Sequence, residues 1–433
     1  MPVTLPRSRF QRQLVSRSTI RKLIAVVIIW AIVEAQLIYY RVAHAERDTQ
    51  AQATTLLKPT RVYIASLHWN NAAILRSDWN KGVVDLTKAL GADNVFVSVY
   101  ESGSWDDSKG ALRELDRELG KLGVQRQIIL DKETHQDAID APPAEHGWIT
   151  SPTGEKRLRR IPYLAAMRNL SLQPLLDMAE NGTTFDYVLF LGDVVFSVSI
   201  EDHGHLRMFL KLLLTLFFLQ VPDIVALLNT NDGQYAAACS LDFSKPPRFY
   251  DTFALRDSGG HEYATQTWPY FRSANSRKAI LRGAPVPVSS CWNGIVAMHP
   301  SVFTGVNGLK FRGIDDTLAE YHLEGSECCL IHADNPASRS RGVFINPNVR
   351  VGYSRKAYEA VHPPGGWLSL SQVFAGLWKN RAARWFQTPL FKELQVRWRV
   401  RKWAEKGEGR EEPGPFCLIN EMQVIVHNGW AHL

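Results

Sequence analysis

The sequence is poor in cysteine, and none of its cysteines stands in a CxxC pair. Five cysteines in 433 residues exclude a disulfide-dense secreted scaffold, and their spacing suits neither a zinc site nor a redox motif. In an oxidising compartment they allow one or two disulfides and leave at least one thiol over. The cysteines are Cys239, Cys291, Cys328, Cys329 and Cys417.

The body of the chain also lacks a strong net charge. The whole sequence carries +7, but residues 1–22 hold six basic residues and no acidic one, so the remaining 411 residues together carry +1. A nearly neutral body argues against a nucleic-acid partner, which needs a basic surface. The sequence shows no internal repeat and no low-complexity tract.

One long apolar run follows the basic tail, from Leu23 to Tyr40. Its 18 residues would span about 27 Å as a helix, which is enough for a thin bilayer core. Only Glu34 is charged within it, and Tyr39, Tyr40 and Arg41 stand where an interfacial belt would lie. The run predicts an uncleaved transmembrane signal anchor at 23–40, with a cleaved signal peptide and a buried core helix as alternatives.

The charge asymmetry around this run predicts the orientation of the chain. The basic tail, residues 1–22, is expected in the cytosol, and a polar stem at 41–60 is expected to lead into a lumenal body. Two glycosylation sequons agree with a lumenal body, Asn169-Leu170-Ser171 and Asn181-Gly182-Thr183.

The body, residues 61–360, alternates between short apolar runs and helical patterns. Strands are expected at 61–66, 94–100, 126–130 and 187–193, with helices at 72–90, 104–120 and 163–180 between them. Such alternation predicts an α/β fold with a mostly parallel sheet flanked by helices. Ligands are then expected at the carboxyl ends of the strands.

Polar side chains stand where several of these strands end. Asp193 directly follows a nearly all-apolar strand, a position from which a carboxylate can hold a divalent cation against a diphosphate. A helix cap or a turn is the structural alternative for this aspartate. Further polar clusters lie at 66–79, at 100–107, before a short strand at 291–298, and around an expected buried strand at 324–334.

These clusters lie in stretches that resemble a known family. The stretches include IASLHWNNAAILRSDWNKGVVDL, VFVSVYESGSWDDSK, FDYVLFLGDVVF, FYDTFALRD, SCWNGIVAM, EGSECCLIHADNP and INPNVRVGYS. As a set they resemble the fungal capsule-associated α-1,3-mannosyltransferases of glycosyltransferase family 69. The resemblance implies a GT-A-type nucleotide-diphosphosugar transferase fold, GDP-mannose as donor, Mn²⁺ or Mg²⁺ as cofactor, retention of configuration, and a single-pass type II anchor in the Golgi membrane.

The resemblance also implies roles for individual residues. Asp193 is the metal candidate, with His332 completing the metal shell. Glu327 is the candidate catalytic carboxylate, and Glu324 is the alternative. The family usually has asparagine where this chain has Gly192, and no DxD motif is present there. The candidates for the donor nucleotide are Ser66, His68, Asn70, Arg76 and Glu101, and those for donor sugar or acceptor are Asp242, Trp292 and Asn293.

An atypical apolar segment, residues 203–222, interrupts the body between two family-like stretches. It is too short for a second membrane span and would put Asp193 and Glu327 on opposite sides of a membrane. Two hypotheses stay open: translation of unspliced intron sequence, or a real insertion that forms an apolar surface helix.

The last part of the chain, residues 361–433, is rich in tryptophan and arginine and predicts amphipathic helices. These helices would either pack on the catalytic core through tryptophan or present a basic face to a membrane or an anionic partner.

The sequence thus predicts a lumenal, metal-dependent, retaining α-1,3-mannosyltransferase that acts on a mannose-containing glycan. A complex with other glycosyltransferases is an open expectation. One alternative is a catalytically inactive relative that binds glycans or assembles complexes. Another is a transferase that uses a different sugar nucleotide, such as a GDP- or UDP-linked xylose.

Overall fold

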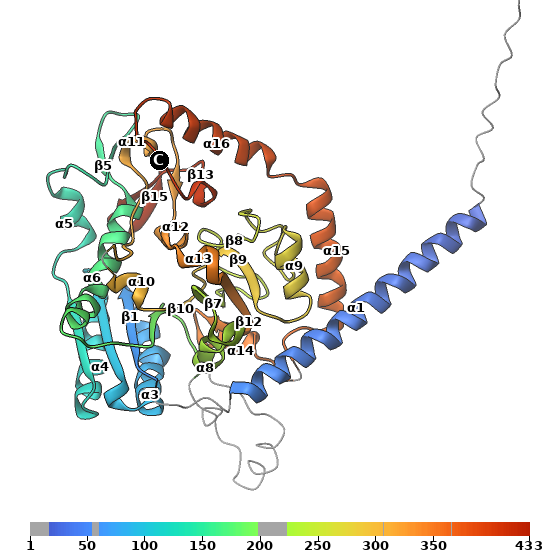
Figure 1. The fold of residues 1–433 in the computed structure, drawn as a ribbon, viewed down its shortest axis with the longest axis horizontal. Helices are drawn as coiled ribbons and strands as arrows, with labels where there is room; N and C mark the ends of the chain where they lie inside the picture. Colours follow the sequence, from blue (N-terminus) through green and yellow to red (C-terminus); the bar gives the residue numbers. More distant parts are fainter. Residues whose placement is uncertain (1–16, 54–59, 198–222, 306, 365) are drawn as a thin grey trace, which may run out of the picture.

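The computed structural model describes residues 17–53, 60–197, 223–305, 307–364 and 366–433 (Figure 1). The atypical segment 203–222 falls outside the described residues. The body is built on one large sheet with helices on both faces, and helix α1 extends away from it toward the N-terminus.

The large sheet has nine strands in the order β3-β2-β1-β6-β10-β7-β12-β9-β8. β1 pairs in parallel with β2 and β6, β2 with β3, and β7 with β12. β10 runs antiparallel between β6 and β7, and β9 runs antiparallel between β12 and β8, so most strands point in one direction. The α/β class and the mostly parallel sheet are therefore confirmed. The strands are β1 (Val62–His68), β2 (Val95–Glu101), β3 (Gln125–Leu130), β6 (Tyr187–Leu191), β7 (Ala237–Phe243), β8 (Arg256–Asp257), β9 (Val286–Ser290), β10 (Ile295–Met298) and β12 (Val343–Gly352).

The central strands are apolar along their whole length because both faces of the sheet are covered. Tyr63 and Phe190 belong to the apolar cluster on one face, while Ile64 and Leu189 belong to the cluster on the other. Alternate side chains of one strand thus enter opposite cores, as the pleat of a strand requires. The four strands expected from the sequence each coincide with an observed strand, β1, β2, β3 and β6.

Helices on one face of the sheet come from the segments between the first strands. α2 (Ala72–Ile74) continues through a π-helical turn at Leu75–Trp79 into α3 (Asn80–Leu90), and α4 (Ser108–Lys121) packs beside it. On the other face, α6 (Arg160–Glu180) contacts β1 and β2 and continues through Pro174 without a break. The remaining helices of the body are α5 (His135–Asp140), α8 (Asp223–Leu228), α9 (Ala274–Ile280), α10 (Ser301–Thr304), α11 (Asp316–Ala319), α13 (Ala337–Arg341) and α14 (Arg355–Ala360).

The expected buried strand at 324–334 is wrong. Only Glu324–Gly325 is extended, as strand β11, and helix α12 (Glu327–Asp334) follows. The Ser326 side chain caps this helix by accepting a hydrogen bond from the Cys328 backbone N–H. The helix is buried on nearly all sides, so its sequence lacks the alternation of apolar and polar faces that marks an amphipathic helix. A short apolar segment without this pattern is equally consistent with a buried strand.

Helix α1 (Arg17–Ala53) is continuous and much longer than the expected span at 23–40. It is helical through 41–53, so that part of the expected stem is an extension of the same helix. Ser18–Thr49 is long and apolar enough to cross a membrane by length and composition. Residues 18–30 are exposed throughout, whereas Ala35, Ile38 and Val42 join the core of the body. These features are compatible with a single-pass anchor.

The C-terminal residues are helical only in their first part. α15 (Leu370–Phe386) and α16 (Leu390–Ala404) agree with the expected helices, but short strands follow, β13 (Leu418–Ile419), β14 (Gln423–Val426) and β15 (Gly429–His432). β13 pairs with β11, and β14 with β15, while β4 (Trp148–Thr150) pairs with β5 (Lys156–Leu158) in a separate hairpin. The end of the chain therefore returns to the segment that carries Glu324 and Glu327.

Two disulfides join Cys239 to Cys291 and Cys329 to Cys417, and Cys328 is a buried free thiol. The expectation of one or two disulfides with at least one thiol left over is confirmed. The Cys329–Cys417 bond fastens α12 to the C-terminal segment beside β13, which helps to hold Glu327 in place.

Candidate functional site

Predicted site residues from separate stretches of sequence lie at one edge of the large sheet, where the parallel strands end. β1 ends at His68, β2 ends at Glu101, and β6 ends at Leu191, two residues before Asp193. β7 carries Asp242 close to its own carboxyl end. Because β10 is antiparallel to β6 and β7, its amino end meets the same edge and brings Trp292 and Asn293 there.

The ends of β6 and β10 approach each other closely at two glycines. The Gly192 N–H donates to the Gly294 carbonyl at 2.9 Å. A Cβ on Gly192 would lie 2.8 Å from the same carbonyl oxygen, so an asparagine at this position would require the backbone to move. Gly294 has φ +87°, and a Cβ there would lie 2.5 Å from Val351 Cγ2. Both positions therefore need glycine in this structure.

Asp193 is half-buried and is oriented by the side-chain amide of Asn71, the residue before α2. The Asn71 side chain donates from Nδ2 to Asp193 Oδ2 at 2.9 Å. Burial raises the pKa of Asp193 to about 6, although the Asn71 hydrogen bond and the charge of Arg168 act in the opposite direction.

A second acidic group lies beside it on β7. Asp242 is fully buried; its Oδ1 accepts from Asn293 Nδ2 at 2.8 Å and its Oδ2 accepts from the Tyr353 hydroxyl at 3.1 Å. Burial and the neighbouring Asp251 carboxylate raise the pKa of Asp242 to about 7. Burial, followed in size by the carboxylates of Asp242, Asp193 and Asp251, raises the pKa of Tyr353, so these three acids share one electrostatic neighbourhood.

Glu327 is the first residue of α12 and is held by Arg168 of α6. Arg168 Nε donates to Glu327 Oε1 at 3.0 Å, and the glutamate is buried. Burial alone would raise the pKa of Glu327, but the positive charges of Arg168 and Arg160 outweigh it and lower that pKa. Glu327 is therefore ionised at neutral pH.

Arg168 links the two parts of the site. Its guanidinium carbon lies 4.9 Å from the centre of the Trp292 ring, and its charge acts on the pKa values of both Glu327 and Asp193. Arg168 thus contacts Glu327 directly and acts on Asp193 through its charge, although the two acids come from segments more than 130 residues apart.

The oxygen atoms at this edge fit a hard divalent cation. Asp193 and Asp242 supply carboxylates, and the buried Asn293 Oδ1 has no hydrogen-bond partner. Mg²⁺ and Mn²⁺ prefer such oxygen ligands and complete their shells with phosphate oxygens. Carboxylates with raised pKa values also favour a cation, because a nearby positive charge stabilises their ionised form.

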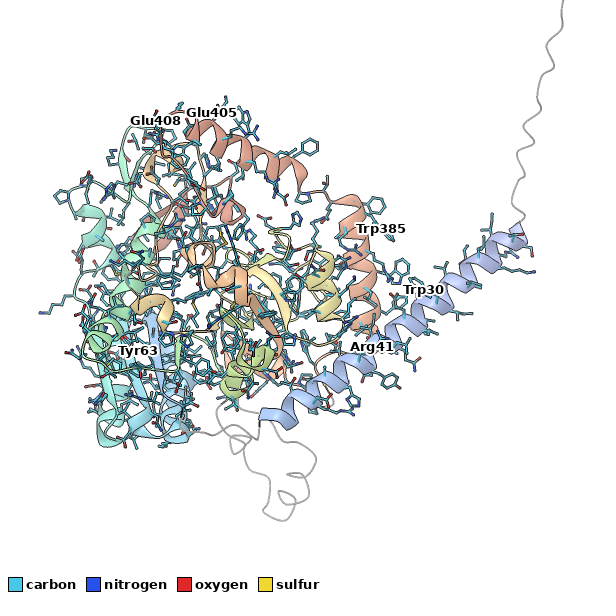
Figure 2. All side chains as sticks on the ribbon, viewed as in Figure 1. Trp30, Arg41, Tyr63, Trp385, Glu405 and Glu408 are labelled. Carbon is cyan, nitrogen blue, oxygen red and sulfur yellow. A yellow bond between two sulfur atoms is a disulfide. The ribbon has the colours of Figure 1, made fainter. Side chains whose placement is uncertain are left out.

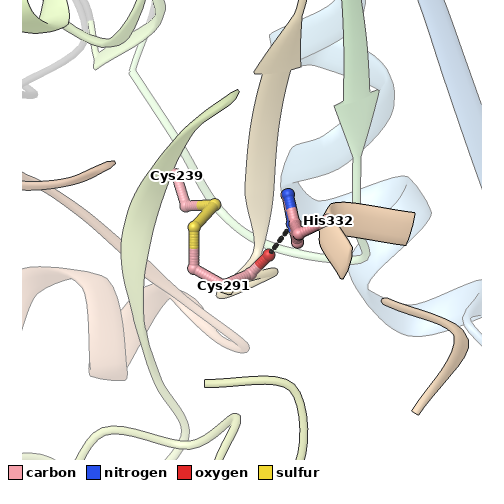
Figure 3. A group of neighbouring side chains, drawn as sticks. All are labelled: Cys239, Cys291 and His332. Carbon is pink, nitrogen blue, oxygen red and sulfur yellow. Dashed lines mark hydrogen bonds between the residues drawn. A yellow bond between two sulfur atoms is a disulfide. The ribbon is translucent and has the colours of Figure 1, made fainter. Parts of the chain in front are cut away.

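His332 contacts Cys291, the residue before Trp292 (Figure 3). Its Nε2 donates to the Cys291 carbonyl at 2.7 Å, beside the Cys239–Cys291 disulfide. Among the described residues, these three form the one group of His, Cys, Asp or Glu residues whose ligand atoms lie within 4.8 Å of one another. Sulfurs joined in a disulfide cannot act as thiolate ligands, so we do not carry His332 into the proposed metal set.

Ser66 and His68 form an internal support for the loop after β1. Ser66 Oγ donates to the Leu191 carbonyl at 2.6 Å and lies 2.9 Å from His68 Nε2. The other ring nitrogen of His68 lies 3.2 Å from Asn71 Oδ1, and burial lowers the pKa of His68 to about 4. Both side chains are buried and serve to position Asn71, which in turn holds Asp193.

The remaining nucleotide candidates divide into two kinds. Asn70 has φ +53°, and its side chain accepts a hydrogen bond from the Trp105 N–H in the loop after β2. Buried Glu101 forms an ion pair with Lys109 at 3.2 Å. Asn70 and Glu101 therefore shape this loop. Arg76 points to α4 and pairs with Asp107 at 2.5 Å and Glu114 at 3.1 Å. Its guanidinium is engaged between helices, and the structure offers no support for a phosphate contact there.

Glu324 is held differently from Glu327. It forms an ion pair with Arg159 at 2.8 Å, and both side chains are wholly buried. Arg159 also donates to the Ile314 carbonyl and pairs with Asp316. This network joins β11 to the start of α6, so Glu324 has a structural role and Glu327 is the better catalytic candidate.

Four residues of the site were not predicted from the sequence: Asn71, Arg168, Asp251 and Tyr353. Asn71, Asp251 and Tyr353 lie in the family-like stretches, but nothing in their local pattern separates them from their neighbours. Arg168 lies in a helix without a distinct polar face, and only its contact with Glu327 marks it.

Comparison with known proteins agrees with the resemblance seen in the sequence. A family model described as Cryptococcal mannosyltransferase 1 matches residues 61–203 and 212–334, which is more than half of the chain. The chain belongs to this family. The match is interrupted between 203 and 212, within the atypical segment.

A curated relative is the α-1,3-mannosyltransferase CMT1 of Cryptococcus neoformans, 24% identical over 293 residues. The aligned region covers 63% of this chain and 53% of the relative, so the chain spans about half the length of the curated relative that it matches.

Solved structures of glycosyltransferases also superpose on the chain at low similarity. A mannosyltransferase from Pyrobaculum calidifontis in complex with GDP-Man and Mn²⁺ covers 89% of this chain and 79% of its own, with 14% identity and a TM-score of 0.34. S. aureus TarS covers 81% of this chain and 50% of its own, with 9% identity and a TM-score of 0.36. TM-scores of this size support no inference about the site.

We expect Glu324→Gln to destabilise the protein. It would leave the buried Arg159 with only the partly exposed Asp316 as counter-charge, which costs about 3 kcal/mol of unfolding free energy. Urea unfolding in detergent measures this cost. The matched control is Glu155→Gln, which breaks an exposed pair with Arg157 and should cost under about 1 kcal/mol. Equal stability of the two variants would contradict the structural role of Glu324.

Proposed function

We propose that the protein is a metal-dependent, retaining α-1,3-mannosyltransferase that transfers mannose from GDP-mannose to a mannose-containing glycan. Family membership supports mannosyl transfer, and the site supports the chemistry. The observation that carries the proposal is that ionised Glu327, fixed by Arg168, faces the same neighbourhood as Asp193 and Asp242.

The metal would be held by Asp193 and Asp242, with Asn293 Oδ1 as a neutral oxygen donor. When bound, the cation offsets the negative charge that develops on a departing diphosphate. Asn71 keeps the Asp193 carboxylate in one orientation, and Tyr353 does the same for Asp242. Both acids are thus positioned before a ligand arrives.

Glu327 would act at the anomeric carbon, either as a nucleophile or by stabilising an oxocarbenium-like state. Arg168 fixes one of its carboxylate oxygens and lowers its pKa, so the group is negative throughout the neutral pH range. The Trp292 ring beside Arg168 offers an apolar wall for a sugar ring.

Asp193→Asn and Glu327→Gln should each lower GDP release from GDP-mannose and Mn²⁺ by at least about 100-fold, because each removes a charge used in the transition state. Coupled detection of GDP, with product linkage and anomeric configuration read by NMR, measures the effect. The matched control is Asp85→Asn on α3, a carboxylate paired with the surface residues Lys81 and Lys88. Wild-type rates in both site variants would contradict the proposal.

Binding of the metal should depend on pH, because ligand carboxylates must be ionised to hold it. Asp193 and Asp242 have pKa values raised to about 6 and about 7, so protons compete with the cation below those values. The gain in thermal midpoint with saturating Mn²⁺ should be large at pH 8 and small at pH 5.5. A gain that is independent of pH would exclude these two carboxylates as ligands.

A non-catalytic glycan-binding or complex-assembly role is the second candidate, favoured by Gly192 in place of the family's usual asparagine. A transferase using another sugar nucleotide is the third. Thermal-shift measurements with GDP-mannose, GDP-xylose and UDP-xylose separate them, since a ligand that binds the native state raises the midpoint. Binding without turnover favours the non-catalytic role.

We also propose a Golgi location with the body in the lumen and α1 as a type II anchor. The two disulfides support an oxidising compartment. The two sequons differ in the structure: Asn181 is exposed after the end of α6, whereas the Asn169 amide both donates to and accepts from the Phe311 backbone.

Expression in a secretory system should therefore give a single N-glycan, at Asn181. Asn181→Gln should abolish the mass shift produced by an endoglycosidase, whereas Asn169→Gln, the matched control, should leave it unchanged. A protein that carries no glycan at either position would contradict the lumenal orientation.

A further inference from the structure

Exposed aromatic and apolar side chains gather on α15 and α16, on the side of the body where α1 lies. Phe386 and Phe391 are 84% and 82% exposed, far more than such side chains usually are in a water-facing surface. Figure 2 shows Trp385 at the end of α15 and Trp30 on α1 along the same margin of the molecule. We call this set the shoulder; it consists of Trp385, Phe386, Phe391, Leu394 and Trp398.

The part of α1 that projects from the body is too short to cross a bilayer by itself. The exposed part before the first contact with the body, that of Trp30 with Arg381, is residues 18–29, and its uncharged apolar stretch, 23–29, measures only about 10 Å along a helix. A bilayer core of about 30 Å needs roughly twice as many residues as that or more. Residues 31–40 must therefore also lie in the hydrocarbon if α1 crosses a membrane.

Those same residues pack against α15. α1 contacts α15, and Ala35 and Ile38 of α1 belong to the same buried cluster as Val373 and Leu377 of α15. Because α15 lies alongside α1 at this depth, α15 must enter the membrane with it. Arg381 contacts Glu34 and Trp30, and the exposed end of α15 follows it at Trp385, on the side of Trp30 (Figure 2).

The charges at this contact fit a low-dielectric setting. Glu34 is the one charged residue of the apolar run, and Arg381 of α15 donates to both of its carboxylate oxygens at 2.5 and 2.7 Å. The guanidinium also lies 5.1 Å from the Trp30 ring centre and 4.9 Å from that of Trp378. A charge in a bilayer is tolerated when it is paired in this way.

The outer helix has the composition of an interfacial helix. Phe391, Leu394 and Trp398 recur at helical spacing on one face of α16, and Lys402 lies over the Trp398 ring at 3.8 Å. The exposed cations Lys392, Arg397 and Arg401 flank this face. Such long basic side chains reach lipid phosphates while aromatic rings enter the acyl region.

We propose that the shoulder is embedded in the leaflet on the body's side of the membrane, so that the protein holds the bilayer through α1, α15 and α16 together. The occupant of this surface is phospholipid. The inference rests on the proposed anchor role of α1, and it adds that the catalytic body is fixed against the membrane instead of being free on a stem.

The test uses the full chain reconstituted in phosphatidylcholine vesicles with a photoreactive group in the lipid acyl chain. Mass spectrometry then maps the labelled residues. The expected labels lie on the exposed residues of α1 between 23 and 40 and on the shoulder residues. Trp105 and Trp430 are internal controls, since both are exposed but lie elsewhere on the body, and they should stay unlabelled.

The outcomes separate the two proposals. Labels on α1 without labels on the shoulder overturn the inference and favour a protein partner or water there, while the absence of labels on α1 overturns the anchor itself. Phe386→Glu combined with Phe391→Glu should lower labelling of α16 by about fivefold or more, because charged side chains avoid hydrocarbon. Labelling of α1 should persist. Leu170→Glu, an exposed site on α6, is the matched control and should change neither.

Discussion

The contact between Arg168 and Glu327 is the interaction on which the site depends. It joins α6, which follows the first half of the sheet, to α12, which comes near the end of the body, and it places a negative carboxylate in a buried position. Burial raises the pKa of Glu327, and the charge of Arg168, joined by that of Arg160, outweighs burial and lowers it. The same arginine acts on Asp193 and packs on Trp292, so one cation connects the two parts of the site.

The surrounding structure holds the Arg168 and Glu327 side chains in contact. The Arg159–Glu324 pair and the Cys329–Cys417 disulfide fasten the segment before and within α12, and the close approach of Gly192 and Gly294 brings β6 to β10. The ion pair and the disulfide are wholly buried, so the site is preorganised by the core. The predicted nucleotide-binding residues Ser66 and His68 are also buried, and they support the site indirectly by positioning Asn71.

The sheet could be predicted from the sequence because strands buried on both faces, such as the one before Asp193, read as unbroken apolar runs between helical patterns. The location of the candidate site residues at the carboxyl ends of the strands could also be predicted, because parallel strands end at the same edge of a sheet. The helix at Glu327 could not be predicted, since a segment buried all round has no period. Neither could the roles of Arg168 and Glu324, because a side chain's ion-pair partner 159 or 165 residues away leaves no local signal. The long extent of α1 was missed because its polar end is stabilised by tertiary contacts such as Glu46 with Arg350.

The most direct test of the account is the position of the metal in crystals grown with GDP and Mn²⁺ and measured at the manganese absorption edge. The account predicts one anomalous peak at coordination distance from Asp193 and Asp242, with the diphosphate between this peak and Glu327. A peak at His332, or a nucleotide bound with Glu327 turned away from it, would contradict the account.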